Sequence, residues 1–394
     1  MTSNLHDRFD ATTIDFADTT DTAKLPQPIT PPIKQATYKS KAEDFVVNEI
    51  LDIDFTNAGE HLWLHIQKSG INTAYLAKLL SEWAGIPLRD VGYSGLKDRK
   101  ALTTQWFSLR LPKKQLPTTD FAPIDIGDNE SITILATQWH NKKLNRGTHR
   151  ANQFIITLRD VKFDHDKSSI EEHLQAISAS GVPNYFGSQR FGFGGNNIKE
   201  ALQLFARPVA NKHSKPSSRK KSKGKSTLRE QNSMELSAAR SLIFNEILAA
   251  RVRSGSWNTG LDGEVFNLNG SGSIFATEAI DDILSARLGS GDIHPTGALW
   301  GVSNDKTTGK AAQIENTVVQ QNTLLSQLAT GLEQRQVKEQ RRALRLPIED
   351  LTWEWVDQPT GERTLILSFT LITGSFATSV LANLVQQLHT VVSL

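Results

Sequence analysis

The sequence predicts an α+β protein in which a mixed, mainly antiparallel sheet is covered by helices. Segments with the two-residue alternation of strands follow one another closely over residues 44–161, and few helical segments separate them. Residues 181–345 read mainly as helical, and strand-like alternation returns after them. Strands in direct succession favour an antiparallel or mixed sheet over a doubly wound parallel one.

The same changes of pattern predict how the chain divides. Residues 1–35 are polar, acidic and rich in Thr, Asp and Pro, which predicts a flexible arm. One domain is expected at 36–180 and again at 346–394, with a second domain inserted at 181–345. Residues 211–228 carry seven Lys or Arg and no acid, so we expect a disordered basic loop there. That loop either grips phosphates or only keeps the chain soluble, and composition does not decide between the two.

The strands are predicted from apolar residues at every second position. Leu62, Leu64 and Ile66, for example, share one face of their segment. The expected strands are DFVVNEI (44–50), HLWLHIQ (61–67), TQWFSLRL (104–111), SITILATQW (131–139), NQFIITLRDV (152–161) and RTLILSFTL (363–371).

The helices are predicted from apolar residues at helical spacing and from their caps. Asn72 is a plausible N-cap for a helix over 72–83, and Ser168 with Glu171 forms a capping-box pattern for one over 167–181. Further helices are expected over 234–253, within 314–344, and over 375–389 with Phe376, Val380, Leu384 and Leu388 on one side.

Composition excludes several classes of protein. The chain has 394 residues and no cysteine, so disulfides, thiolate metal sites and cysteine nucleophiles are excluded. It has no apolar run long enough to span a bilayer, and its ten histidines show no metal-ligand spacing. We therefore expect a cytoplasmic protein.

Charge is distributed unevenly along the chain. The net charge is +2, but residues 1–60 carry five basic against eleven acidic residues, whereas 91–150 carry ten against five. A basic region of this kind suits a polyanion such as nucleic acid, although charge alone favours a solvated surface.

The segment GYSGLKDRKALTTQWFSLR (92–110) carries the strongest chemical signal. Gly92 and Gly95 allow a tight backbone path, and Asp98 follows among Lys97, Arg99 and Lys100. Cationic neighbours keep a carboxyl ionised, which suits a nucleophile better than a proton donor. The three cations cannot all pair with one carboxylate, which leaves some of them for phosphates. Alternatively, Asp98 only caps its own turn.

With these residues in hand, the chain resembles the TruD-type tRNA pseudouridine synthases. The resemblance rests on segments that occur in order: KAEDFVVNEI, GLKDRKALTTQW, NQFIITLRD, GVPNYFGSQRFGFGGNN, LSAARSLIFNEILAARV, GALWG and GSFATSV. It implies a catalytic domain with the pseudouridine synthase fold, interrupted by a TRUD insertion domain. It also implies isomerisation of a uridine in tRNA, uridine 13 in bacterial members, without cofactor or metal.

The resemblance also implies roles for individual residues. Asp98 stands where the family has its catalytic aspartate, attacking either the ribose C1′ or the base. Lys39 would keep Asp98 charged and Phe45 would pack near it. Asn152 would hydrogen-bond the uracil edge and Phe154 would stack on the base, although alternation alone also explains a buried Phe.

The remaining expected contacts to the substrate come from several places. Lys97 and Arg99 are candidates for phosphates, and Gln189, Arg190 and Phe191 would either shape the cleft between the domains or hold a hinge. We expect a monomer that binds tRNA, with no membrane, metal or cofactor. The alternatives are a noncatalytic RNA-binding or tRNA chaperone protein and, from GFGGNN (192–197), a nucleotide-dependent enzyme.

Overall fold

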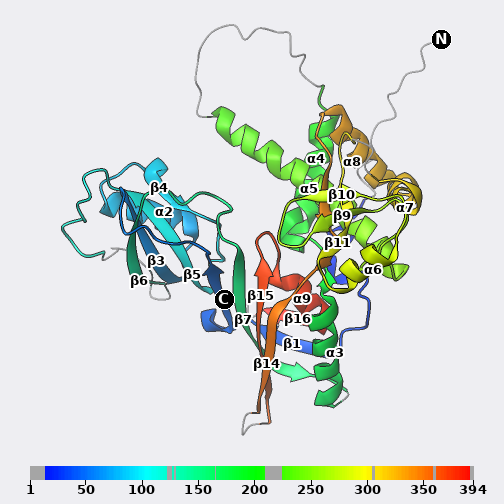
Figure 1. Ribbon diagram of the computed structural model, residues 1–394, viewed down its shortest axis with the longest axis horizontal. Helices are drawn as coiled ribbons and strands as arrows, with labels where there is room; N and C mark the ends of the chain where they lie inside the picture. The colour runs from blue at the N-terminus through cyan, green and yellow to red at the C-terminus, as the bar shows by residue number, and fades with distance from the viewer. Residues whose placement is uncertain are drawn as a thin grey trace. The chain divides into compact units, whose positions relative to one another are not determined.

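The protein forms two compact units. The sheet unit comprises Thr30–Val182 and Pro347–Leu394, and the helical unit comprises Met1–Ile29 and Pro183–Leu346. This computed structural model (Figure 1) describes residues 14–121, 127, 130–164, 166–208, 224–303, 307–357 and 361–390.

The sheet unit is built on one large, mainly antiparallel sheet. Its strands run in the order β14-β15-β7-β2-β5-β3-β6, with β1 added beside β7 and β16, and β4 beside β5. Among the described strand pairs of this large sheet, β1–β16 and β2–β5 are parallel and the others are antiparallel. The strands are β1 (Ile33–Tyr38), β2 (Phe45–Ile50), β3 (His61–Ser69), β4 (Val91–Tyr93), β5 (Leu102–Arg110), β6 (Ser131–His140), β7 (Ala151–Lys162), β14 (Glu349–Asp357), β15 (Arg363–Ile372) and β16 (Val385–Thr390).

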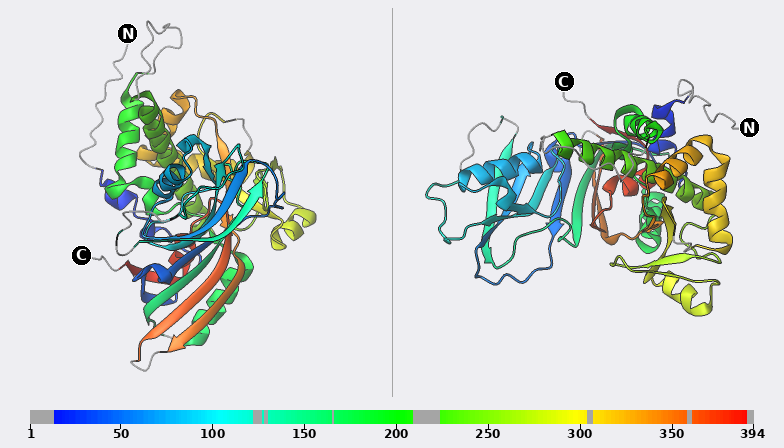
Figure 2. Two further views of the ribbon diagram at one scale, coloured as in Figure 1. Left: turned by 90° about the vertical axis from the view of Figure 1, so that its left-hand side faces the viewer. Right: turned by 90° about the horizontal axis from the view of Figure 1, so that it is seen from above.

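Helices cover this sheet at two places. The helix α2 (Thr73–Trp83) packs Leu76 and Leu80 against Leu62 and Leu64 of β3. The helix α3 (Lys167–Ser180) lies alongside β14 (Figure 2), and α9 (Ala377–Leu384) leads directly into β16. The α+β class predicted from the sequence is therefore confirmed.

The helical unit contains a small sheet of four strands in the order β10-β9-β11-β12. The long helix α5 supplies much of its core through Leu242, Ile243 and Ile247. Its elements are α1 (Phe16–Thr19), α4 (Asn196–Ala206), α5 (Gly224–Arg253), β9 (Val265–Leu268), β10 (Ile274–Ala276), α6 (Asp282–Gly289), β11 (Ile293–Leu299), α7 (Gly309–Gln321), α8 (Thr323–Gln334) and β12 (Gln340–Ala343). Two short strands, β8 (Val182–Pro183) and β13 (Arg345–Leu346), also pair.

Short 3-10 helices occur in both units, at Thr22–Lys24, Ala42–Asp44, Leu88–Asp90, Ser188–Phe191 and Phe193–Gly195.

Several expected elements differ from the structure. The capping box at Ser168 and Glu171 is wrong, because the N-cap of α3 is Asp166 and Ser168 lies inside the helix with its hydroxyl on Asp166. The helix expected over 375–389 ends at Leu384, since Val385 onward pairs in parallel with β1. The long helix expected within 314–344 is divided into α7 and α8 at Asn322, whose side chain caps α8.

The two segments expected to be disordered are described only in part. Residues 1–13 and 209–223 lie outside the described residues. The rest of the expected arm contains α1 and the start of β1, and α5 already begins at Gly224 within the expected basic loop. Gly195 has φ +74°, and a Cβ there would lie 2.5 Å from the Phe16 carbonyl oxygen, so a glycine lets α1 pack closely in the helical unit.

Candidate active site

Asp98 lies in the loop between β4 and β5 of the sheet unit. Its carboxylate pairs with the ammonium of Lys39 and accepts a hydrogen bond of 2.9 Å from the Lys100 amide. The Asp98 side chain is 39% exposed and that of Lys39 is 17% exposed. The carboxylate therefore has partners on one side and remains accessible to a large ligand.

The charge of Asp98 follows from these contacts. Burial by itself raises the pKa of the carboxyl, but the hydrogen bond and charge of Lys39, together with the Lys100 amide, hold it below its ordinary value. Burial, followed by the negative charge of Asp98, raises the pKa of the nearby Tyr38 hydroxyl. At neutral pH the site thus presents an ionised carboxylate beside a neutral phenol.

Lys39 connects Asp98 to a row of aromatic rings. Its ammonium lies 4.2 Å from the centre of the Phe45 ring, close enough for a cation–π contact. The Phe45 ring meets Phe154 edge to face at 6.1 Å, and Phe154 stacks on Phe369 with centroids 5.6 Å apart. Because Phe45, Phe154 and Phe369 are buried, these rings form a rigid base beneath Lys39.

Lys97 faces the interior, in contrast to the phosphate contact expected for it. Its ammonium forms a buried ion pair of 2.9 Å with Glu49, and the second Glu49 oxygen accepts a hydrogen bond from the Trp106 amide. Arg99 points outward and is largely exposed, with hydrogen bonds to the Gly70 carbonyl and to Glu130. Of the two residues expected to contact phosphates, only Arg99 thus has a side chain that is accessible from solvent.

Asn152 of β7 lies opposite Glu49 of the neighbouring strand β2 and contacts a histidine. Its Nδ2 is 3.4 Å from Nε2 of His149, and His149 Nδ1 is 2.6 Å from the Ser94 hydroxyl. The Asn152 Oδ1 is buried and has no hydrogen-bond partner among the described residues. A buried amide oxygen without a partner is unusual in proteins, which makes it a candidate acceptor for a donor group of a ligand.

Most of the expected site residues thus lie together in the sheet unit, and the remaining three belong to the helical unit. Contacts connect Asp98, Lys39, Phe45 and Phe154, and also Lys97 and Asn152 through Glu49 and His149. Gln189, Arg190 and Phe191 belong to the helical unit, where Phe191 is buried and Arg190 donates to the Ser237 hydroxyl.

Sequence reasoning missed several residues of this site. Lys68 is fully buried and donates hydrogen bonds to the Asp98 and Ile71 carbonyls. His149, which is hydrogen-bonded to the Ser94 hydroxyl, lies beside the Asn152 amide, and Tyr38 adjoins the Phe45 ring. None of these residues stands out by type or spacing; Lys68 follows Leu62, Leu64 and Ile66 at the two-residue spacing, but a lysine there does not by itself predict burial.

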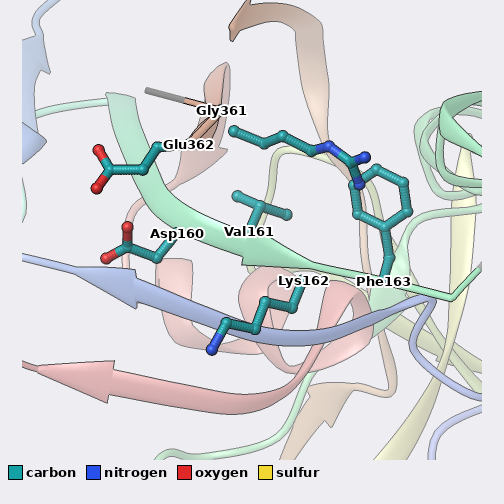
Figure 3. A pocket seen from close by; sticks show the side chains of 7 residues that line it. Asp160, Val161, Lys162, Phe163, Gly361 and Glu362 are labelled. Carbon is teal, nitrogen blue, oxygen red and sulfur yellow. The ribbon is translucent and has the colours of Figure 1, made fainter. Parts of the chain in front are cut away.

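At least two concavities lie in the described part of the sheet unit. One of about 440 Å³ adjoins the Asp98 loop and is lined by Ile71, Asn72, Tyr75, Arg99, Gly127 and Glu130. The other, of about 410 Å³, is lined by Asp160, Lys162, Glu362 and their neighbours (Figure 3), and includes none of the expected site residues. Within the described residues, no cluster of His, Asp or Glu is able to hold a metal, and no helix is long and apolar enough to cross a membrane.

Comparison with solved structures first concerns the fold. The fold is similar to that of a crystal structure from Methanosarcina mazei described as a candidate tRNA pseudouridine synthase D, with a TM-score of 0.66 over 93% of this chain and 96% of that one. The sequence identity is 21%, so this likeness concerns the fold alone.

Sequence comparison then defines the family. The family model described as tRNA pseudouridine synthase D (TruD) matches residues 30–202 and 206–384. The tRNA pseudouridine synthase D of Psychrobacter arcticus is 68% identical over 95% of this chain and 96% of its own length. That of Xanthomonas campestris pv. campestris strain 8004 is 42% identical over 92% and 94%. The chain belongs to the TruD family of tRNA pseudouridine synthases, which are isomerases.

Proposed function

We propose that this enzyme converts uridine 13 of tRNA to pseudouridine with Asp98 as its nucleophile. The observation that carries the proposal is the accessible Asp98 carboxylate, held ionised by Lys39 and the Lys100 amide. An ionised carboxylate beside a cation has the properties of a nucleophile rather than of a proton donor. The position of the target uridine comes from the resemblance to bacterial TruD proteins.

The reaction is an isomerisation in which all atoms of the nucleoside are kept. The bond between C1′ and N1 of uracil breaks, a bond between C1′ and C5 forms, C5 loses a proton and N1 gains one. Asp98 attacks either C1′ or the base, and the loss of its covalent bond to substrate completes the cycle. Lys39 supports either route, because it keeps Asp98 ionised before attack and stabilises the carboxylate as it leaves.

The target base must leave its stack before Asp98 reaches it. Flipping a base out costs a few kcal/mol, and contacts with aromatic rings return about 1–3 kcal/mol per base. In this proposal Phe154, which stacks on Phe369 and meets Phe45 edge to face, supplies the aromatic ring that the uracil contacts. The unpartnered Asn152 Oδ1 accepts a hydrogen bond from the N3–H of uracil.

The surface beside Asp98 is suited to the tRNA backbone. Arg99 and Lys100 are exposed, and the concavity next to them is lined by Tyr75. Arginine binds phosphate through two parallel hydrogen bonds, which positions the RNA without reading its sequence. Gln189, Arg190 and Phe191 are assigned to substrate binding on the resemblance alone.

Mapping pseudouridines in cellular tRNA tests the proposed substrate. RNA from cells with and without this protein is compared, and we expect pseudouridine to disappear at position 13 in the deletion and to return when the gene is restored. An unchanged map at position 13, with loss at another tRNA position, would refute the assigned uridine but not the enzyme class. No change anywhere would contradict the proposed activity on tRNA.

A further inference from the structure

Lys68, at the end of β3, places a fully buried positive charge beneath the catalytic loop. None of its surface is exposed, and its ammonium donates hydrogen bonds of 2.7 Å to the Ile71 carbonyl and 3.2 Å to the Asp98 carbonyl. A buried ammonium is costly unless it is hydrogen-bonded or paired. An apolar residue at this position would avoid that cost. The lysine therefore indicates a role for its positive charge or its hydrogen bonds.

The hydrogen bonds of Lys68 join the segment 70–73 to the loop 97–99, and two further hydrogen bonds connect the same two segments. The Gly70 amide donates to the Arg99 carbonyl at 3.0 Å, and the Lys97 amide donates to the Thr73 hydroxyl at 2.9 Å. The chain from 70 to 73 therefore serves as a support for the loop from 97 to 99. Lys68 contacts the middle of that loop, at the residue whose carboxylate faces the substrate.

The charged groups around Lys68 set its electrostatic role. Burial lowers the pKa of Lys68 to about 8, while Asp98 raises it and Lys97 lowers it further. Lys97 is itself paired with Glu49, and Lys39 reaches Asp98 from the carboxylate side. Lys68 in turn lowers the pKa of Asp98, so it adds positive potential from the buried side of the loop.

We propose that Lys68 is a positioning residue for the reaction: its ammonium holds the Asp98 backbone in place and supports the negative charge of the Asp98 carboxylate. This inference rests on the proposed role of Asp98 as nucleophile. Lys68 does not touch the substrate, so it acts on the chemical step and not on tRNA binding. The reaction requires its protonated form, because a neutral amine supplies no positive potential.

The experiment compares Lys68→Met with Lys78→Met. Lys78 is an exposed lysine of α2, so the second variant makes the same substitution on the surface of the same unit. We measure kcat and KM for tRNA from about pH 6 to about pH 9.5, together with the folded fraction. For Lys68→Met we expect kcat to fall by roughly tenfold or more, with the KM for tRNA changed by less than about twofold. Lys78→Met should behave as the wild type.

The pH profile separates positioning from a purely structural role. In the wild type we expect kcat to decrease as Lys68 loses its proton near pH 8, and we expect this decrease to be absent from Lys68→Met. Ionisation of the uracil itself affects both proteins alike. A Lys68→Met protein with the wild-type kcat per folded molecule and the wild-type pH profile would overturn the inference.

A second variant decides the matter if Lys68→Met does not fold. In Lys68→Arg the charge does not titrate below about pH 12, so the decrease near pH 8 should vanish while part of kcat is kept. Persistence of that decrease would exclude Lys68 as its origin. Asp98→Asn distinguishes the two proposals: activity in that variant refutes the nucleophile itself, whereas an inactive Asp98→Asn with an unaffected Lys68→Met refutes only the role of Lys68.

Discussion

Two ion-pair groups, one in each unit, differ in what they leave exposed. In the helical unit, the Arg341 side chain is 1% exposed and pairs with Glu315 at 2.7 Å and Glu339 at 3.3 Å. It also donates to the backbone carbonyl and the hydroxyl of Thr296. In the sheet unit, the Asp98–Lys39 pair leaves more than a third of the Asp98 side chain accessible.

The comparison teaches that exposure, rather than pairing, separates a structural carboxylate from the one proposed to react. Two adjacent residues illustrate this: Lys97 makes a buried pair with Glu49, and Asp98 makes an accessible pair with Lys39. Buried pairs are costly to break because they leave an uncompensated charge, and accessible pairs contribute little to stability. We therefore expect mutations in the two groups to separate stability from activity.

Breaking the buried group should give the largest loss of stability. Arg341→Met leaves Glu315 buried without its cation, and we expect the free energy of unfolding to decrease by about 3–5 kcal/mol. Urea denaturation measures this. The control is Lys310→Met, at an exposed pair of 3.8 Å with Asp262, which should cost less than about 1 kcal/mol. Equal effects of the two variants would contradict the distinction drawn between the groups.

Acidification should also weaken the helical unit before it affects Asp98. His294 is buried and accepts a hydrogen bond of 2.9 Å from Arg345. Burial, followed by the charge of Arg345, lowers the pKa of His294 from 6.5 to about 4. The unfolded chain therefore binds the extra proton between these values, and stability decreases as the pH falls from about 6.5 to about 4.

The expected loss over this window is on the order of 3 kcal/mol. Urea denaturation at several pH values measures it, and His294→Gln should flatten the dependence. His389→Gln, at an exposed position, serves as the control and should leave the slope unchanged. A wild-type stability that does not vary over this window would show that His294 is not the titrating group.

Removing the cation of the accessible pair should reduce activity more than stability. For Lys39→Met we expect kcat to decrease by about 10- to 100-fold, because Asp98 loses the charge that keeps it ionised, with a change in unfolding free energy below about 1 kcal/mol. Lys34→Met removes an exposed pair with Asp164 from the same strand region and should keep full activity. A Lys39→Met enzyme with normal kcat would contradict the proposed role.

Salt should affect binding but not the chemical step. Raising the salt concentration from about 50 to about 200 mM should weaken tRNA binding on the order of tenfold, while kcat at saturating tRNA stays nearly constant. Arg99→Ala should reduce the slope of log K against log salt by about 1 if Arg99 contacts one phosphate. Binding that is insensitive to salt would contradict the expectation that basic residues within 91–150 contact tRNA phosphates.

The sequence was most informative where local rules decide the structure. Period-two alternation located β2, β3, β5, β6, β7 and β15, and Asn72 caps α2 as expected, with its side chain accepting from the Tyr75 amide. The likeness to a known family identified Asp98 and Lys39, which the structure brings into contact. These features depend on neighbours in sequence or on a motif that is visible in it.

The sequence was least informative where distant segments decide the outcome. Val385 onward has helical spacing, but pairing with β1 makes it a strand. Glu49 determines that Lys97 turns inward, although the two residues are far apart in the chain. The burial of Lys68 depends on how the Asp98 loop folds over β3, which no local pattern specifies.

The central claim is that the Asp98 carboxylate carries out the reaction and is not needed for the fold or for tRNA binding. The most direct measurement compares purified Asp98→Asn with the wild type, with Asp164→Asn as an exposed control. We expect kcat/KM for pseudouridine formation to decrease on the order of 10⁴-fold or more in Asp98→Asn, with the Kd for tRNA within about threefold of the wild type. Pseudouridine formation by Asp98→Asn within about tenfold of the wild-type rate would contradict the account.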